Sequence, residues 1–593
     1  MADNFEGLKR TDMCGQVRMS DIGREVVLCG WVRKYRNLGT LLFVDLRDRS
    51  GICQIVFDEG TADALSQKAQ TLRAEFVVAV RGKVRERDSK NPNLPTGDVE
   101  ILVEELRILS RAQTPPFAIE ENSAVNDVLR FKHRYLDLRR PDLQRNFFLR
   151  HKVAKAARDY FDGAGFLEIE TPMLIKSTPE GARDYLVPSR VHPGSFYALP
   201  QSPQMYKQLL MLAGYDRYMQ IVRCFRDEDL RADRQPEFTQ IDLEMSFVDI
   251  DDVIEINEGF LKELFLNVQG VELKTPFPRL SYKEAMDRFG SDKPDMRFGF
   301  ELRDLSVALK NSAFKVFADA LQGGGSVRAI NVAGFADKFS RKDIDALGEF
   351  VKGYGAKGLA WMKILEGGEI QSPIAKFLSE EEMAQIVQIM DAKPGDLLLF
   401  GADRDTVVFD ALGALRCECA NRLELLDPNE FCFLWVVEFP LFEYDEEANR
   451  YVAKHHPFTA PKEEDREKIE NDPANARAKA YDIVLNGIEI GGGSIRIYDS
   501  AVQEKMFLAL GFTKEEAMER FGFLIEAFQY GTPPHGGMAY GLDRLVMLMA
   551  GCESIRDVIA FPKVQNASEL MSGAPGTVDE KQLGELGIDV KLL

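Results

Sequence analysis

The chain has 593 residues, of which 45% are hydrophobic and 29% charged, with a formal net charge of −20 at pH 7. A single hydrophobic core stops growing near ~250–300 residues, so this length predicts several domains, and the composition is that of a soluble globular protein. The negative charge excludes a uniformly basic coat for nucleic acid, but it is compatible with local basic patches.

Membrane and metal signals are weak in this sequence. No apolar run approaches the ~20 residues of a membrane span, and the first ten residues lack the apolar centre of a signal peptide. The eight cysteines are scattered, and the nearest pair, Cys417 and Cys419, does not have zinc-knuckle spacing. We therefore expect free thiols, no zinc, no membrane association and a cytoplasmic location.

The region 24–109 contains five strand-like runs with one helical stretch after the third. The runs are 25–33, 40–47, 51–57, 74–85 and 98–109, and the helical stretch is 61–72. This order predicts an OB barrel, which binds single-stranded nucleic acid on the face of its second and third strands. Arg36, Phe43 and Gln54 fall there, and a cation, an aromatic ring and an amide suit an unpaired base. The alternative that Phe43 belongs to the barrel core stays open.

Two further features follow the barrel. Residues 112–123 are polar and contain two prolines, which predicts a linker. The basic stretch 130–140 is either a solvated helix face or a surface for an RNA backbone. Next, residues 146–161 have helical spacing, and 166–174 predict a strand broken at Pro172.

Residues 218–247 predict two strands joined by a charged loop. Apolar and polar residues alternate in the second strand from Gln240 to Phe247, which places them on opposite faces. The first strand ends at Phe225 and is followed by Arg226-Asp227-Glu228. A solvated hairpin tip would explain the charged loop but not the polar strand face. That face is suited to be the floor of a site for a charged ligand.

Two regions on either side of this hairpin carry weaker signals. Residues 199–207 place proline, hydroxyl and amide residues before a predicted helix at 204–212, but helix starts favour such residues anyway. Residues 290–427 mix helical and strand patterns with glycine clusters. They predict an inserted α/β domain without a charged constellation.

The region 450–500 adds histidines and carboxylates. His455 and His456 are adjacent, so they point in opposite directions on an extended chain and make a poor metal pair. Asp482 and Glu489 precede a triple glycine and Arg496. Strict alternation would put Glu489 and Arg496 on opposite faces, whereas a bulge at the glycines would bring them together.

The stretch Gly541-Leu542-Asp543-Arg544 opens an apolar helix that ends at Gly551. A cation in the first helical turn is disfavoured by the helix dipole, so Arg544 is expected to have an anionic partner such as a polyphosphate. The sequence has no Ser/His/Asp order and no activated thiol, so covalent catalysis is not predicted. Arginines with carboxylates suit phosphoryl or adenylyl transfer, where positioning and charge stabilisation dominate.

These segments together resemble the class II aminoacyl-tRNA synthetases of the aspartyl/asparaginyl/lysyl subgroup. Residues 166–174 resemble motif 1, 225–238 motif 2 and 541–544 motif 3. The Arg-Asp-Glu form at 226–228 and the aspartate at Asp543 are similar to the bacterial aspartyl branch. The resemblance covers essentially the whole chain.

The resemblance implies a multidomain α+β and β architecture: an OB barrel, an antiparallel catalytic sheet flanked by helices, and an inserted α/β domain. The expected boundaries are 1–111 for the anticodon-binding barrel, 112–145 for a hinge, 146–289 and 428–562 for the two catalytic parts, 290–427 for the insertion and 563–593 for a C-terminal extension.

The resemblance also implies site residues. For aspartate they are Glu180, Gln204, Met205, Tyr206, Lys207, Arg226, His455 and Arg496. For ATP they are Arg226, Asp227, Glu228, Gln235, Phe238, Glu489, Gly541, Leu542, Asp543 and Arg544, with Arg226 and Arg544 as the catalytic arginines. For the anticodon they are Arg36, Leu38, Phe43 and Gln54. Asp482 and Glu489 are expected to hold Mg²⁺ with ATP.

The implied reaction is ATP-dependent activation of L-aspartate to aspartyl-adenylate and transfer to the 3′ end of tRNA(Asp), by a homodimer. Charging of tRNA(Asn) as well stays open, because residue chemistry around Leu38 and residues 87–91 does not decide it. Asparaginyl or lysyl ligases of the same subgroup are disfavoured by the insertion and by Asp543. An RNA-binding paralogue without aminoacylation is disfavoured by the intact Arg226, Glu489 and Arg544.

Overall fold

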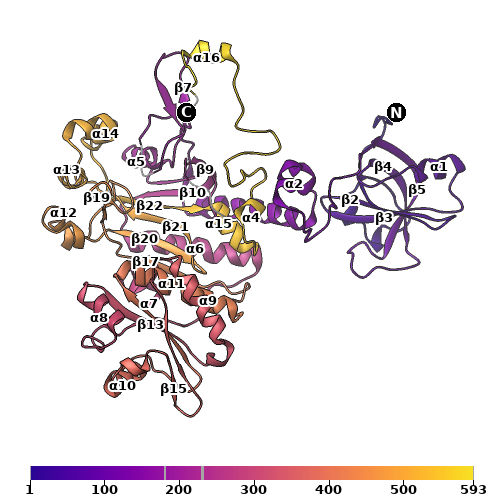
Figure 1. Ribbon diagram of the computed structural model, residues 1–593. Coiled ribbons are helices and arrows are strands. Elements are labelled where there is room, and N and C mark those ends of the chain that lie inside the picture. Colours follow the sequence, from indigo (N-terminus) through magenta and orange to yellow (C-terminus); the bar gives the residue numbers. More distant parts are fainter. Residues whose placement is uncertain (1, 179–181, 229–232, 592–593) are drawn as a thin grey trace. The chain divides into compact units, whose positions relative to one another are not determined.

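The computed structural model describes residues 2–178, 182–228 and 233–591. The chain divides into two compact units (Figure 1). The first comprises residues 1–148 and 556–576, and the second comprises 149–555 and 577–593.

A closed five-stranded barrel forms most of the first unit. Its strands are β1 (Glu25–Asn37), β2 (Leu42–Asp48), β3 (Gly51–Phe57), β4 (Val77–Glu86) and β5 (Val99–Ser110), in the order β1-β2-β3-β5-β4. Helix α1 (Asp63–Gln70) follows β3. Alternate residues such as Val44, Leu46 and Ile55 fill the interior and are fully buried. The predicted OB barrel is therefore confirmed.

The basic stretch 130–140 belongs to the first unit and runs from the end of α2 (Asp127–Lys132) through α3 (Arg134–Asp137). Arg134 is only 1% exposed and donates to the carbonyl oxygens of Arg556, Ile559 and Ala560 at 2.8–2.9 Å. Arg140 is 5% exposed and pairs with Asp137. The expectation of an exposed basic face is therefore wrong for these two arginines, because their side chains are buried and form contacts within the first unit.

An eight-stranded sheet is the centre of the second unit, and its strands lie side by side in Figure 1. In sheet order they are β11 (Arg279–Ser281), β17 (Phe433–Val437), β20 (Ala480–Leu485), β21 (Ile488–Ile495), β22 (His535–Gly541), β10 (Glu237–Ser246), β9 (Arg217–Phe225) and β6 (Leu167–Glu168). All neighbouring pairs are antiparallel except the two outermost, β11 with β17 and β6 with β9. It agrees with the antiparallel sheet that the resemblance implies for the catalytic part, and we call it the catalytic sheet.

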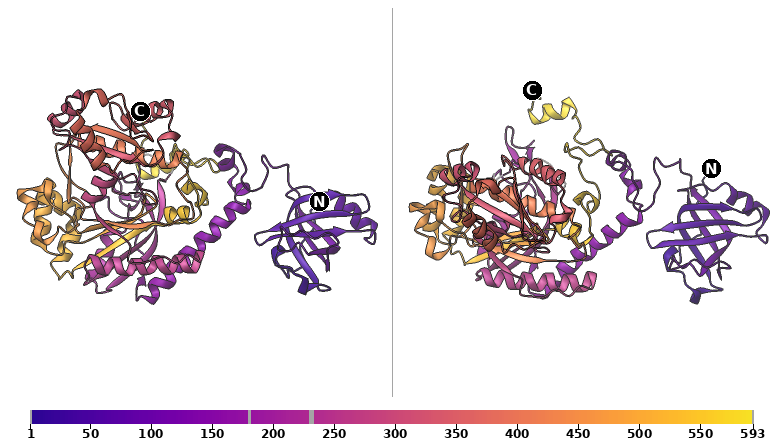
Figure 2. Two further views of the ribbon diagram at one scale, coloured as in Figure 1. Left: turned by 90° about the horizontal axis from the view of Figure 1, so that it is seen from below. Right: turned by 60° about the horizontal axis from the view of Figure 1, so that its bottom comes forward.

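The two faces of this sheet have different environments. Apolar residues of β10 such as Ile241 and Leu243 are at most 1% exposed. Two helices, α4 (Pro141–Gly163) and α6 (Ile250–Gln269), lie beside each other on one side of the sheet (Figure 2). Phe260 of α6 packs on Phe161 of α4 and on Tyr540 of β22. The opposite face carries the polar residues of β10 and borders a cavity.

The inserted domain has its own five-stranded sheet in the order β12-β13-β16-β14-β15. Its strands are β12 (Leu302–Asp304), β13 (Ser326–Val332), β14 (Ala360–Ile364), β15 (Ile370–Gln371) and β16 (Leu397–Asp403). Its helices are α8 (Lys315–Gln322), α9 (Arg341–Lys352), α10 (Glu380–Ile389) and α11 (Asp405–Arg422). The mixture of helices and strands agrees with the sequence prediction. All its strand pairs are antiparallel.

The remaining elements surround the catalytic sheet or end the chain. They are α5 (Gln204–Leu212), α7 (Tyr282–Phe289), α12 (Lys468–Asn471), α13 (Ser500–Ala509), α14 (Lys514–Phe528), α15 (Leu542–Met549) and α16 (Glu580–Leu586), with the short hairpins β7 (Leu186–Pro188) with β8 (Phe196–Ala198) and β18 (Phe442–Asp445) with β19 (Arg450–Ala453). Among the described residues, none of the helices has both the length and the apolar character of a membrane span.

Candidate active site

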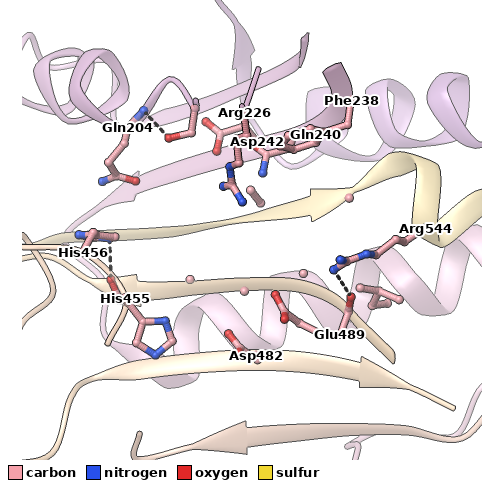
Figure 3. Close-up of a pocket in the computed structure, with 18 of the residues that line it drawn as sticks. Gln204, Arg226, Phe238, Gln240, Asp242, His455, His456, Asp482, Glu489 and Arg544 are labelled. Atoms are coloured by element: carbon pink, nitrogen blue, oxygen red, sulfur yellow. Dashed lines mark hydrogen bonds between the residues drawn. The ribbon is translucent and has the colours of Figure 1, made fainter. Parts of the chain in front are cut away.

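A cavity of about 510 Å³ lies on the polar face of the catalytic sheet, entirely within the second unit. Figure 3 shows Gln204, Arg226, Phe238 and Asp242 on one side of it and His455, Asp482, Glu489 and Arg544 on the other. Its lining comes from segments between Ser202 and Ile555. The fold therefore assembles side chains that are hundreds of residues apart in the sequence.

One end of the cavity contains a buried network of two cations and two carboxylates. Lys207 Nζ lies 2.7 Å from Asp242 Oδ1 and 3.3 Å from Glu244 Oε2. The Arg496 guanidinium donates to both Glu244 oxygens, at 2.9 and 3.0 Å. All four side chains are at most 2% exposed. Although burial opposes ionisation, the charges of Arg496 and Lys207 lower the pKa of Glu244 to about 2.

His456 stands against this network. Its Nε2 lies 2.7 Å from Arg496 Nη1, which also donates to Ser494 Oγ. Glu244 thus holds one edge of the guanidinium, while the Nη1 edge points toward His456 and the cavity lining. Burial, followed by the charge of Arg496, lowers the pKa of His456 well below its ordinary value, so its imidazole is neutral at pH 7.

His455 lies at the same end but has other neighbours. Its ring packs edge-on against Phe439, with 4.9 Å between ring centroids, and its buried Nε2 has no hydrogen-bond partner among the described residues. Burial and the charges of Lys454 and Arg496 lower the pKa of His455 to about 4. Both histidines line the cavity, whereas the sequence prediction selected His455 alone and missed His456.

Asp482 and Glu489 face each other from neighbouring strands. Ile483 pairs with Gly491 and Val484 pairs with Glu489, so Ile490 is an unpaired extra residue, a bulge. This bulge reverses the alternation and puts Glu489 on the same face as Arg496. It lies at Ile490, just before the glycines at which the sequence predicted it.

Gly492 leaves room between these two carboxylates, since a Cβ atom there would lie 2.2 Å from Asp482 Oδ1. Burial, followed by the charge of Glu489, raises the pKa of Asp482 well above its ordinary value. A bound cation would relieve this repulsion, so the pair is suited to a hard divalent metal. Within the described ranges, no group of three or more His, Cys, Asp or Glu side chains is arranged to hold a metal.

Arg544 lies at the other end of the cavity, in the first turn of α15. Its Nη1 donates to the Glu489 carbonyl oxygen at 3.2 Å, and its Nη2 lies 3.0 Å from Asp233 Oδ2. The predicted anionic partner of Arg544 is thus, in this structure, a carboxylate of the charged loop. An anionic ligand at this position would compete with Asp233 for the guanidinium.

Arg226 and Phe238 lie on the wall of the cavity across from Arg544 (Figure 3). The Arg226 guanidinium lies over the Phe238 ring, 5.2 Å from its centroid, and its buried Nε has no hydrogen-bond partner in the described part of the chain. Glu228 and Gln235 also line the cavity. The predicted residue Glu180 lies outside the described residues, as do residues 229–232 of the loop.

Four predicted site residues do not line the cavity: Met205, Tyr206, Asp227 and Leu542. Met205 and Tyr206 are turned by the helical repeat away from Gln204 and Lys207, and they pack with Phe458 and Phe507 in a hydrophobic cluster. Asp227 is directed to Arg183 at 3.4 Å, and Leu542 is buried in the core. We therefore leave the side chains of these four residues out of the proposed ligand contacts.

Gly541 and Asp543 of motif 3 border the cavity, but neither offers it an unpaired charged group. Gly541 ends β22, where the chain turns into α15. The Asp543 carboxylate accepts from Arg150 Nη1 at 2.6 Å and from the Thr239 backbone N–H at 2.8 Å. Asp543 therefore joins α15 to β10 and α4.

Several cavity residues were not among the predicted ligand contacts. They include Asp233, Asp242, Asp292, Lys454 and His456. For Asp242, the alternation along β10 was a sufficient signal, because it placed this residue on the polar face. For Asp292 there was no local signal, because only tertiary packing brings the start of the inserted domain to this cavity.

A separate polar patch lies on the barrel of the first unit. Arg36 Nη2 donates to Gln54 Oε1 at 3.0 Å, and its guanidinium carbon is 5.9 Å from the centroid of the Phe43 ring. Phe43 is only half-buried, so it faces outward and is not part of the barrel core. Leu38 is 69% exposed, whereas Gln54 is buried and also bonded to Glu100.

The fold and this cavity define a class II tRNA synthetase. Residues 126–565 match the family described as tRNA synthetases class II (D, K and N), and residues 26–109 match the OB-fold nucleic acid binding domain. The chain belongs to the class II tRNA synthetases.

Full-length relatives narrow this class. The aspartate–tRNA ligase of Ruminiclostridium cellulolyticum is 62% identical over 592 residues, and the aspartate–tRNA(Asp/Asn) ligase of Caldanaerobacter subterraneus subsp. tengcongensis is 60% identical over 594 residues; both alignments cover 100% of each chain. The asparaginyl-tRNA synthetase of Pyrococcus horikoshii, solved with asparaginyl-adenylate, has a TM-score of 0.58 and 19% identity, covering 94% of this chain and 98% of that one. At this identity the likeness supports the fold alone.

Proposed function

We propose that this protein is an aspartate–tRNA ligase that forms aspartyl-adenylate from L-aspartate and ATP and transfers the aspartyl group to tRNA(Asp). The observation that carries the proposal is the division of one cavity into two ends. One end has buried cations beside His456, and the other has Arg226, Phe238 and Arg544. The first suits an acidic side chain, and the second suits a nucleotide triphosphate. The full-length relatives named as aspartate–tRNA ligases support the same reaction.

The amino acid is held at the buried end in this proposal. Lys207 and the Nη1 edge of the Arg496 guanidinium bind the side-chain carboxylate of aspartate. His455 and His456 lie beside that carboxylate. Asp242 Oδ2 is buried without a hydrogen-bond partner among the described residues, and Gln204 Nε2 is likewise unpartnered. These two atoms suit the α-ammonium and α-carboxylate groups of the substrate, because an unsatisfied buried polar atom is stabilised by a ligand partner.

ATP occupies the other end. Phe238 stacks on adenine, and Glu228 accepts a hydrogen bond from its amino group. The α-carboxylate of aspartate attacks the α-phosphorus, the bond to the β-phosphate oxygen breaks, and pyrophosphate leaves. Arg226 neutralises the charge that develops on the α-phosphate, and Arg544 binds the terminal phosphate.

We assign Asp482 and Glu489 as the side chains that would hold Mg²⁺ with ATP, because their mutual repulsion fits a bound cation. When bound, the ion neutralises phosphate charge. In the second step the terminal ribose hydroxyl of the tRNA attacks the carbonyl carbon of the adenylate, and AMP and the hydroxyl proton are released. Arg36, Phe43 and Gln54 contact the anticodon, although Gln54 must first exchange partners.

The test of this function is aspartate-dependent exchange of pyrophosphate into ATP. We expect exchange with L-aspartate and at least about a thousandfold lower kcat/KM with asparagine or lysine, because a hydrogen-bonding site strongly rejects a substrate that leaves its polar groups unpaired. Absence of exchange with aspartate, or equal exchange with asparagine, would contradict the proposal.

The choice of tRNA needs its own measurement. We propose tRNA(Asp) as the substrate, with charging of both tRNA(Asp) and tRNA(Asn) as the alternative, which the name of the Caldanaerobacter relative supports. Aspartylation of purified tRNA(Asn) transcript distinguishes the two. A matched tRNA(Asn) carrying the anticodon of tRNA(Asp) controls for the rest of the tRNA.

We also propose a homodimer, active in the cytoplasm. Around Pro172, Leu167 and Leu174 are 50% and 51% exposed, so the side chains that flank this proline are accessible to a second copy of the chain. Sedimentation equilibrium measures the assembly state. Leu167→Glu with Leu174→Glu should shift it toward monomer, and an unchanged dimer would exclude this surface.

A further inference from the structure

The segment 291–299, which opens the inserted domain, contributes one residue to the wall of the active-site cavity. Asp292 lines the cavity together with Asp482, Glu489 and Lys454. Its side chain is 34% exposed, and its Oδ1 lies 3.6 Å from Lys293 Nζ. By sequence the segment belongs to the insertion, for which no role in the reaction is apparent.

The inserted domain holds this segment firmly on one side. Arg416 of α11 is 1% exposed and donates to the carbonyl oxygens of Asp295 and Gly299 at 3.0 and 2.9 Å. Its guanidinium also lies 4.3 Å from the centroid of the Phe298 ring. A buried guanidinium with several carbonyl acceptors resists displacement, because each lost partner leaves a buried polar group unsatisfied.

The catalytic sheet contacts the same segment on its other side. Gly487 forms the turn between β20 and β21 with φ +81°, and a Cβ atom placed there would lie 3.1 Å from the Cβ atom of Asp295. This hairpin carries Asp482 and Glu489. The segment is thus packed between α11 and the hairpin, which gives Asp292 a defined place relative to the two carboxylates.

We infer that Asp292 is a positioning residue for the magnesium–ATP part of the reaction and acts through water bound to the metal. This rests on the function proposed above. Asp482 and Glu489 offer few of the six oxygen ligands that Mg²⁺ requires, and Mg²⁺ in proteins usually keeps several waters. The described residues contain no third side chain arranged as a direct ligand. A third carboxylate in the same wall therefore suits a hydrogen bond from a metal-bound water.

Asp410 provides a matched control. It is an exposed carboxylate of α11. Partial burial and, second, the charge of Asp292 raise the pKa of Asp410, so the two carboxylates lie within electrostatic reach of each other. Asp410 does not line the cavity. Asp292→Asn and Asp410→Asn therefore remove the same charge from the same neighbourhood, but only the first removes a carboxylate from the cavity wall.

The experiment measures Mn²⁺ binding to the full-length enzyme with a non-hydrolysable ATP analogue by electron paramagnetic resonance, and the Mg²⁺ dependence of pyrophosphate exchange. For Asp292→Asn we expect about a tenfold rise in the Kd for Mn²⁺ and in the half-saturating Mg²⁺ concentration, with the KM for aspartate within about twofold of wild type. Asp410→Asn should leave all three unchanged, and Asp292→Glu should recover part of the affinity.

Two results would overturn the inference. One is wild-type Mn²⁺ affinity in Asp292→Asn. The other is an equal loss in Asp410→Asn, which would indicate a long-range charge effect. A failure of the proposed function can be distinguished from both results, because the wild-type enzyme would then show no aspartate-dependent exchange of pyrophosphate into ATP.

Discussion

The two ends of the active-site cavity are built differently. At the proposed amino-acid end, Lys207 and Arg496 both form ion pairs with Glu244, and all three residues are at most 2% exposed. At the proposed nucleotide end, the side chains of Arg544 and Asp233 are 27% and 41% exposed, and they form one ion pair. Removing one partner of a buried ion pair strongly destabilises the fold, because the remaining charge stays buried without compensation. An exposed ion pair contributes only ~0–1 kcal/mol to stability. We infer that amino-acid selection is preformed and that nucleotide binding depends on exchange of partners.

Arg496→Leu should have the largest effect. It removes the proposed carboxylate ligand and leaves Glu244 buried with only Lys207 as a cationic partner, at a cost of ~3–5 kcal/mol. We expect kcat/KM for aspartate to fall by at least about a thousandfold. Pyrophosphate exchange measures this, and thermal unfolding measures the loss of stability. The double variant Arg496→Leu with Glu244→Gln should recover stability without activity; an active double variant would contradict the assignment.

Arg544→Ala should raise the KM for ATP and lower the adenylation rate by about a hundredfold, because the cation positioned on the terminal phosphate of ATP is lost. The partly exposed position predicts little change in stability. Single-turnover adenylation and a thermal melt test both points. If both kinetic constants stay at wild-type values, Arg544 does not bind the nucleotide.

Phe43→Ala tests whether the cavity acts independently of the barrel. Stacking on one base contributes ~1–3 kcal/mol, so the KM for tRNA(Asp) should rise by about tenfold or more. Pyrophosphate exchange without tRNA should be unchanged, because Phe43 lies in the other unit. Loss of both activities would indicate misfolding.

Asp233→Asn should have the smallest effect, in the opposite direction. It removes the carboxylate that competes with ATP for Arg544, and an exposed pair of ~0–1 kcal/mol converts to at most about a fivefold lower KM for ATP. The KM for aspartate should not change. A higher KM for ATP would mean that Asp233 assists binding and does not compete with it.

The predictable part of this site followed from local patterns. The period of two along β10 placed Asp242 and Glu244 on a polar face, and the first-turn cation of α15 indicated an anionic partner for Arg544. The barrel was also predicted, because each strand has its own alternation and turn residues. By contrast, the burial of Met205 in the hydrophobic cluster around Phe458 was not predictable, because it depends on which face of α5 packs against that cluster.

The sequence by itself determined the types of residue available, the elements that carry them and the class of chemistry, because these depend on spacing over short stretches of the chain. Only the tertiary structure decided that the bulge at Ile490 brings Glu489 to the face of Arg496, that Arg134 is internal, and that Asp292 of the insertion enters the cavity. The physical reason is that strand register and side-chain burial are set by contacts between distant segments, and these contacts form only when the whole chain is packed.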